Sequence, residues 1–282
     1  LLRVAEELAG HPILLLVIFR PSPELAEAWE KLPRATTITL RDLPAPESEE
    51  LLRALLNGPL PPELRPLIER AHGTPLFVEE MVRYLLDSGV LERDASGEWS
   101  CARPVDRSAV PAQIEQILVA RLDQLDAATR AVVEIAAVIG QPFSERLLAA
   151  VVQEGGGETA ALPEMLDALV RAEVLTLDAS DMATAYAFRH ALIRDVAYGS
   201  ILFARRHELH AQVAAAIERA YADELDEQRG ILAQHYLHAG RSDLAFPHLV
   251  QAAQLAQARY AASEALALYR QALAIAPQHD QA

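Results

Sequence analysis

The first forty residues carry two different hydrophobic patterns. Positions 13–19 form an unbroken apolar run, which is typical of a strand buried on both faces of a sheet. A helical pattern over about 23–32 leads to positions 35–40, which are rich in β-branched residues and alternate in polarity. This order predicts one strand-helix-strand crossover. Because two strands alone make no stable parallel sheet, we expect the rest of the sheet to precede Leu1.

The pattern becomes helical from 45 to 89, with prolines between the helical stretches. Gly73 is placed to end one helix, Thr74 to cap the next, and Pro75 to fit its first turn. Positions 90–105 then hold a polar turn between two short apolar stretches, which predicts a hairpin. We expect this hairpin to be a joint between domains.

The middle of the chain combines helical patterns with one short pair of strands. Two apolar stretches flank a polar turn at 174–177 and 186–188, and they predict a small two-stranded wing. Helices followed by such a wing are typical of a winged helix. The predicted helices before the wing cover about 112–125, 127–139, 144–152 and a further stretch to 172.

The last part of the chain predicts stacked helices. Helical patterns over 190–202 and 205–221 are followed by small residues at the spacing that tetratricopeptide repeats use where two helices touch. In an alanine-rich chain such matches also arise by chance, so a generic helical bundle remains an alternative. The matching positions are Leu232, Ala233, Tyr236, Ala245, Leu249 and Ala252, then Ala253, Ala256, Ala265, Tyr269, Ala272 and Pro277.

Composition agrees with a mainly α fold. Only 5% of the 282 residues are aromatic, and alanine and leucine dominate, which favours helices that meet at close range. The formal charge of −15 repels phosphate backbones and anionic membranes, so we expect no direct nucleic-acid or membrane partner. The longest apolar run, 13–19, is too short to cross a bilayer. With a single cysteine, Cys101, a reducing cytoplasm is the simplest compartment.

Lys31 is the only lysine, and it lies far from any glycine-rich loop. A phosphate-binding loop needs a lysine ammonium beside Gly and Ser or Thr, and arginine does not replace it there. The sequence also offers no motif for Ser/His/Asp or Cys/His catalysis. We therefore expect no catalytic residues and no ATPase activity in this chain alone.

Two histidine pairs raise the question of a metal site. The three-residue spacing of His207 with His210, and of His235 with His238, puts each pair on one helix face. A closed zinc site needs about four ligands, and neither pair is completed by cysteines or nearby carboxylates. We expect packing histidines and no metal. The carboxylates are expected on solvated helix faces, in pairs such as Glu79 with Arg83.

The segment Ala71-His72-Gly73-Thr74-Pro75-Leu76-Phe77-Val78-Glu79-Glu80 resembles the lid of the STAND class of AAA+-related signalling ATPases. In that class a Gly-x-Pro motif packs against the bound adenine, so the resemblance implies that Gly73 and Pro75 face the nucleotide. It also implies that Arg20, at the end of the first predicted strand, senses the terminal phosphate. The alternatives are a plain joint between helices and an ordinary surface arginine.

The resemblance continues over most of the chain. Segments 110–125 and 136–143 are similar to the start of the winged-helix region in bacterial cyclase-linked and LuxR-type regulators, and 188–198 and 205–210 to the passage into their repeats. What departs from the class is the missing phosphate-binding loop and acidic magnesium-binding strand. The resemblance implies four segments: the end of an α/β NTPase core (1–42), a helical lid with a hairpin (43–105), a winged helix (106–204) and the start of a tetratricopeptide-like array (205–282).

This resemblance carries the functional expectation. It implies that the chain is the regulatory part of a STAND-type protein whose output domain is a class III nucleotide cyclase. The parent protein would bind ATP or ADP with magnesium, and we expect this segment alone to bind no cofactor. The partners would be the upstream NTPase half and a protein or small ligand on the repeats. A LuxR-type regulator and a non-enzymatic interaction scaffold remain alternatives. Direct DNA contact is a further alternative, but the acidic chain and the class both disfavour it. It is suggested by four arginines around the predicted wing: Arg189, Arg194, Arg205 and Arg206.

Overall fold

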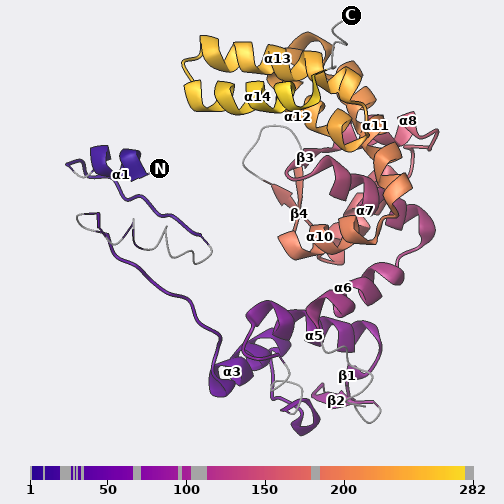
Figure 1. The fold of residues 1–282 in the computed structure, drawn as a ribbon. Coiled ribbons are helices and arrows are strands. Elements are labelled where there is room, and N and C mark those ends of the chain that lie inside the picture. Colours follow the sequence, from indigo (N-terminus) through magenta and orange to yellow (C-terminus); the bar gives the residue numbers. More distant parts are fainter. Residues whose placement is uncertain are drawn as a thin grey trace, which may run out of the picture. The chain divides into compact units, whose positions relative to one another are not determined.

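The computed structural model describes residues 2–8, 10–19, 27, 29, 31–32, 35–65, 71–94, 97–102, 113–178 and 185–276. The fold is mainly helical, as predicted (Figure 1). It divides into two compact units. Unit 1 comprises Leu1–Glu79 with Arg93–Ser100, and unit 2 comprises Glu80–Glu92 with Cys101–Ala282. Each unit is considered by itself.

The two strands predicted near the start are not formed. After helix α1 (Leu2–Leu8), residues 13–19 and 35–40 follow an irregular path, and their apolar side chains are exposed except for the half-buried Val17. Leu14 is 92% exposed, Ile18 87% and Leu40 88%. A strand needs a neighbour for its backbone hydrogen bonds and a layer over its apolar face, and the described part of unit 1 supplies neither. The helix predicted over 23–32 falls largely outside the described residues.

Unit 1 is built around helix α3 (Ala45–Leu56) and the short 3-10 turn η1 (Pro62–Leu64). Helix α3 buries Leu52 and Leu56 and ends at Asn57, whose left-handed backbone closes the helix with bonds back to its last carbonyls. The indole of Trp99 donates to the Leu56 carbonyl. Helix α5 (Pro75–Asp87) follows, and strands β1 (Leu91–Arg93) and β2 (Trp99–Cys101) pair, which confirms the predicted hairpin.

The middle of unit 2 combines helices with a three-stranded antiparallel sheet of order β3-β5-β4. The predicted pair of strands forms as β4 and β5, and a third strand of two residues, too short to recognise in the sequence, pairs with β5. Asp126 and Ser144 cap the helices α7 and α8 through their side chains. The elements are α6 (Ile114–Asp123), α7 (Ala127–Ile139), β3 (Phe143–Ser144), α8 (Glu145–Glu154), α9 (Leu162–Arg171), β4 (Leu175–Asp178) and β5 (Ala185–Phe188).

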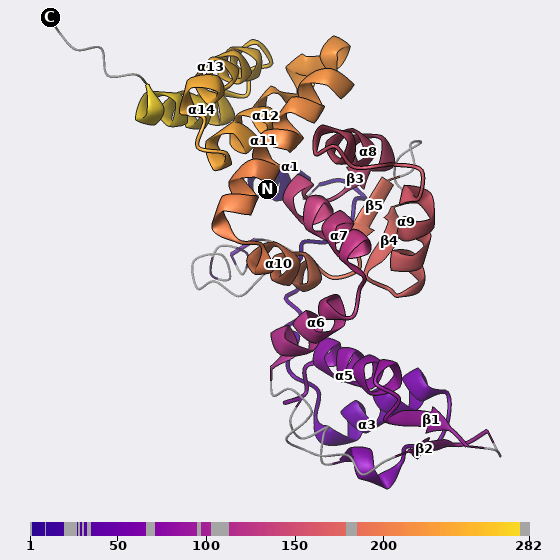
Figure 2. The ribbon, with the colours of Figure 1, turned by 90° about the vertical axis from the view of Figure 1, so that its right-hand side faces the viewer.

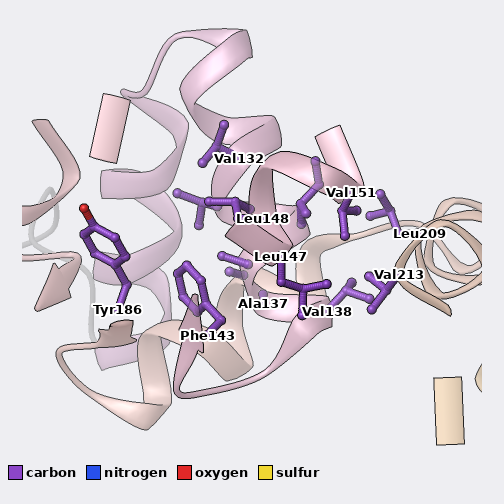
Figure 3. Packing of buried hydrophobic residues seen from close by; sticks show 14 of the residues in the cluster. Val132, Ala137, Val138, Phe143, Leu147, Leu148, Val151, Tyr186, Leu209 and Val213 are labelled. Carbon is purple, nitrogen blue, oxygen red and sulfur yellow. The ribbon is translucent and has the colours of Figure 1, made fainter. Parts of the chain in front are cut away.

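One hydrophobic core runs through unit 2. Phe143 of β3 stacks on Tyr186 of β5 at 6.0 Å between ring centroids, and Leu148 of α8 is fully buried beside them (Figure 3). Leu209 and Val213 of the next long helix belong to the same cluster. Helix α11 (Phe203–Ala220), the second helix after the sheet region, is therefore packed into this core.

The remaining helices follow one another through short turns, and α13 and α14 lie side by side (Figures 1 and 2). The alanines singled out by spacing are buried, except Ala252, which is half-buried. Ala233, Leu249 and Ala272 form one cluster drawn from three helices. Pro277 lies outside the described residues. The helices are α10 (Ala191–Ser200), α11 (Phe203–Ala220), α12 (Leu225–His238), α13 (Ser242–Ala258) and α14 (Ala262–Ile275), with the 3-10 turn η2 (Ala222–Glu224) before α12.

Candidate functional site

The Gly73 joint is a close backbone crossing within unit 1. Leu43 N donates to Gly73 O at 2.8 Å, and Gly73 has a φ of +71°. A Cβ atom at this position would lie 2.2 Å from Leu43 O and 2.7 Å from Leu43 N, both far inside van der Waals contact. Glycine is therefore required here by the packing of the joint alone.

Pro75 is the first residue of α5, where its missing N–H costs no helical hydrogen bond. Its side chain is exposed, as is that of Thr74, so this edge of unit 1 is open to contact by another group. Gly73 and Pro75 thus belong to one joint. Arg20, the third residue assigned to the nucleotide by resemblance, lies outside the described residues.

A buried ion pair lies in unit 2 and was missed by the sequence analysis. Glu80 of α5 is fully buried, and Arg121 of α6 pairs with it while its side chain is only 7% exposed. Arg121 Nη2 also donates to the Ala172 carbonyl at 2.8 Å. The expectation that the carboxylates lie on solvated faces is therefore wrong for Glu80, because its partner comes from a helix 41 positions away.

Further charged side chains lie around this pair. Arg83 Nη1 lies 3.5 Å from Glu80 Oε1, and Arg83 also pairs with Glu173 in the turn before β4. Arg189, just after β5, lies 3.3 Å from the same Glu173 carboxylate, and Asp87 lies 3.8 Å from Arg121. The network joins α5, α6 and both ends of the β4–β5 hairpin. Only the spacing of Glu80, Arg83 and Asp87 on one face of α5 signals it in the sequence.

The two histidine pairs meet on facing helices. His210 Nδ1 of α11 and His235 Nδ1 of α12 are 2.9 Å apart, and His210 Nε2 lies 3.0 Å from Tyr198 Oη of α10. The ring of His238 stacks on His210 at 4.8 Å. His210 is 4% exposed and His235 6%. Among the described residues, no group of three or more His, Cys, Asp or Glu side chains has a geometry that could hold a metal ion.

Burial keeps the paired imidazoles neutral. It lowers the pKa of His210 to about 3, helped by the neighbouring His235, and it lowers the pKa of His235 to about 4, helped by His238. On α13, burial also lowers the pKa of His248, although the Glu218 carboxylate 3.6 Å away acts in the opposite direction.

The chain is similar in sequence to a protein of known sequence from a bacterium. No protein-family model matches this chain. An uncharacterized protein of Rhizobium meliloti is 32% identical to it over 280 residues, which are 97% of this chain and 26% of that protein. The chain therefore spans about a quarter of the length of the relative it matches. Among the described helices, none combines the length and the apolar character needed to cross a bilayer.

Proposed function

We propose that this chain is the regulatory part of a STAND-type ATP-binding signalling protein. Residues 1–42 would complete a nucleotide-binding core, 43–105 form its lid, 106–204 a winged helix, and 205–282 the start of a tetratricopeptide-like sensor arm. In this role the chain transmits a change of nucleotide state and performs no chemistry itself.

The order of elements around the sheet is the observation that carries the proposal. A winged helix runs helix, strand, helix, helix, strand, strand, with its first strand pairing with its last. The order α7, β3, α8, α9, β4, β5 with sheet order β3-β5-β4 fits that description. It lies between the Gly73-Thr74-Pro75 joint and the stacked helices, as the class requires.

The stacked helices support the sensor arm. Helices α11 to α14 follow one another through short turns, and small residues such as Ala233 and Ala253 are fully buried at their contacts. A repeat array of this kind exposes a continuous surface, so its partner would be a protein or a small ligand. A helical bundle that only holds partners together would use the same surface.

The exposed apolar run at 13–19 supports a missing neighbour. Seven consecutive apolar residues with Leu14 92% and Leu16 78% exposed are unfavourable in water unless another layer covers them. The neighbour would be the upstream NTPase half of the parent protein, whose sheet the run would join as a parallel strand. A relative about four times as long as the region it shares with this chain has room for such a half.

The residues of this chain fit one side of a nucleotide only. Pro75 is exposed in the first turn of α5, where it could lie flat against a base without losing conformational freedom on binding. The single lysine, Lys31, pairs with Glu27 on an exposed face, 2.8 Å apart. No phosphate-binding loop is present in the sequence. ATP or ADP with magnesium would therefore bind the parent protein, and this chain supplies no step of its hydrolysis.

The arginines around the wing are engaged within the chain, which argues against direct DNA contact. Arg189 pairs with Glu173, Arg194 with Asp195, and Arg205 with Glu208. Arg206 donates to the carbonyls of Ile201 and Gly199 instead. We assign the protein to the cytoplasm, with a class III cyclase as the output of the parent protein and a LuxR-type DNA-binding domain as the second candidate. The output assignment rests on family resemblance.

The test is ATP binding by this chain and by the longer protein that contains it. Calorimetry is expected to find no ATP binding to the 282-residue chain and submillimolar binding to the longer protein. Pro75→Ala should weaken that binding about 5-fold, because a stacking contact of about 1 kcal/mol is lost. Submillimolar binding to the short chain would refute our account of the missing loop. A longer protein that binds no ATP would leave the interaction scaffold as its function.

A further inference from the structure

Three side chains form a continuous line of hydrogen bonds at the start of the helical arm: Tyr198 of α10, His210 of α11 and His235 of α12. The contacts are Tyr198 Oη to His210 Nε2 at 3.0 Å and His210 Nδ1 to His235 Nδ1 at 2.9 Å. Two imidazole nitrogens at this separation share one proton, because a proton on each would put two donors face to face. The line therefore exists in two neutral arrangements that differ in the direction of both bonds.

In the first arrangement Tyr198 donates to His210 Nε2, and His210 Nδ1–H donates to His235. In the second, His235 Nδ1–H donates to His210, and His210 Nε2–H donates to the tyrosine oxygen. One added proton can be placed on His210, which then donates from both nitrogens. A second proton would have to bind His235 Nδ1. Because His210 Nδ1 already carries a proton, it cannot accept a hydrogen bond from His235, so the second protonation breaks the contact between α11 and α12.

Within the described part of the chain, the groups that act on His210 include no carboxylate that could balance an added proton. The groups that act electrostatically on His210 are His235 and His238 of α12 together with His207 and Arg206 of its own helix. All of them are basic or neutral. Arg206 also lies over the Tyr198 ring, 5.0 Å from its centroid. Protonation therefore places positive charge near a guanidinium, on imidazoles that are themselves almost fully buried.

We propose that the Tyr198–His210–His235 line is an acid-sensitive contact, which holds the arm α12–α14 on helices α10 and α11 at neutral pH and loosens it as the pH falls. The contact lies where the chain passes from the sheet region of unit 2 into the stacked helices. It needs no nucleotide, so it stands whether or not the parent protein is an ATPase.

The size of the effect follows from proton linkage. In the open form both imidazoles regain the ordinary pKa of about 6.5. In the closed form burial lowers the pKa of His210 to about 3 and of His235 to about 4. Between pH 7.5 and pH 5.5 the open form gains protons that the closed form does not, and two such groups raise the opening equilibrium about 100-fold. The opening equilibrium is thus expected to rise progressively as the pH falls below about 6.5.

Hydrogen–deuterium exchange of the full chain, corrected for the intrinsic pH dependence of exchange, measures this opening. Amides of α12 are expected to open about 100-fold more at pH 5.5 than at pH 7.5, while those of α7 to α9 change by less than about 3-fold. The double variant His210→Phe with His235→Leu keeps the apolar volume, and its change in α12 should fall below about 10-fold. The pH response that remains in the double variant is expected from His248 of α13, whose pKa is also lowered by burial. His11→Gln, at an exposed histidine of unit 1, is the matched control and should behave like the wild type.

Equal loosening of α7 to α9 and α12 would mean ordinary acid unfolding and would overturn the proposal, as would an undiminished pH response in the double variant. Imidazole ¹⁵N shifts of the wild type provide a measurement that does not depend on any variant folding. His210 and His235 should be neutral in the closed form at pH 5.5, and titration of both near 6.5 without increased exchange in α12 would also overturn it.

Discussion

Replacing Arg121 with methionine is expected to destabilise unit 2 strongly. Glu80 is fully buried, and the other cation near it, Arg83, is 3.5 Å from its Oε1 atom. Arg121 Nη2 also occupies the Ala172 carbonyl at 2.8 Å, which the variant leaves without this donor. Removing one partner of a buried ion pair costs about 3–5 kcal/mol, because the remaining charge keeps its desolvation penalty. The expected loss in the free energy of unfolding lies in that range.

Urea unfolding followed by far-ultraviolet circular dichroism measures the change. With a slope of about 2 kcal/mol per molar urea, the midpoint of unit 2 should fall by about 1.5–2.5 M. Arg205→Met is the matched control: its side chain is 44% exposed and pairs with Glu208 at 3.2 Å on the surface of the same unit. An exposed pair of this kind contributes about 0.5 kcal/mol or less, so the control midpoint should hardly move.

Removing both charges of the pair is expected to cost less stability than removing Arg121 alone. Replacing both charges, Glu80→Leu with Arg121→Met, leaves no buried ion behind, so the double variant should be more stable than Arg121→Met alone. If Arg121→Met costs no more than Arg205→Met, the pair does not hold α5 and α6 together. If the double variant costs the sum of both single changes, the desolvation argument is wrong.

Three further changes test other parts of the structure. Gly73→Ala should destabilise unit 1 by about 2 kcal/mol or more, because a Cβ atom would lie 2.2 Å from Leu43 O and the φ of this residue is +71°. Trp99 fluorescence during urea unfolding measures this loss of stability. Gly10→Ala is the control and should have little effect, because a Cβ atom there meets nothing within 4 Å. Ser144→Ala should lower the free energy of unfolding by about 1 kcal/mol, because Leu147 N loses the hydrogen bond of 3.2 Å that it donates to Ser144 Oγ. Thermal unfolding followed by circular dichroism measures this loss, and an unchanged stability would show that water replaces the cap. Leu14→Ser should leave the stability of this chain within about 0.5 kcal/mol of the wild type, since the side chain is 92% exposed, but should destabilise a longer protein in which a sheet covers it. An equal effect in both would contradict the missing-neighbour argument.

The predictions that the structure confirms depend mostly on local features of the sequence, such as helix caps and turn residues. Helix α7 occupies the predicted range 127–139, and Asp126, which accepts from Ala128 N and Thr129 N, marks its start by an ordinary capping interaction. The hairpins follow from turn residues between short apolar stretches. Such features depend on neighbours within a few positions, so the sequence carries them directly.

Features that depend on distant partners could not be read in the same way. The run 13–19 has the composition of a buried strand, yet composition cannot supply the neighbouring strand, and in the described residues the run is exposed. The sequence places Glu80 on a solvated helix face. Its burial depends on α6 and the β4–β5 hairpin, whose positions around it are set by the tertiary structure and are not visible in the sequence. Gly73 was assigned to a ligand by resemblance, and the crossing with Leu43 gives it a structural reason that applies with or without that ligand.

The histidines show how the sign of a pH effect depends on such tertiary facts. Spacing alone put His207 with His210 and His235 with His238, and it could not reveal that the two faces meet with Nδ1 atoms 2.9 Å apart. A carboxylate in that contact would have raised the pKa of the imidazoles and made acid stabilising. Burial and neighbouring bases instead lower the pKa of His210 to about 3 and of His235 to about 4. Their contribution to stability is therefore complete well above pH 6.5 and is lost as the pH falls through these two values. His248, beside Glu218, provides the internal comparison: removing that carboxylate with Glu218→Gln should lower its pKa further and steepen the loss of stability in acid.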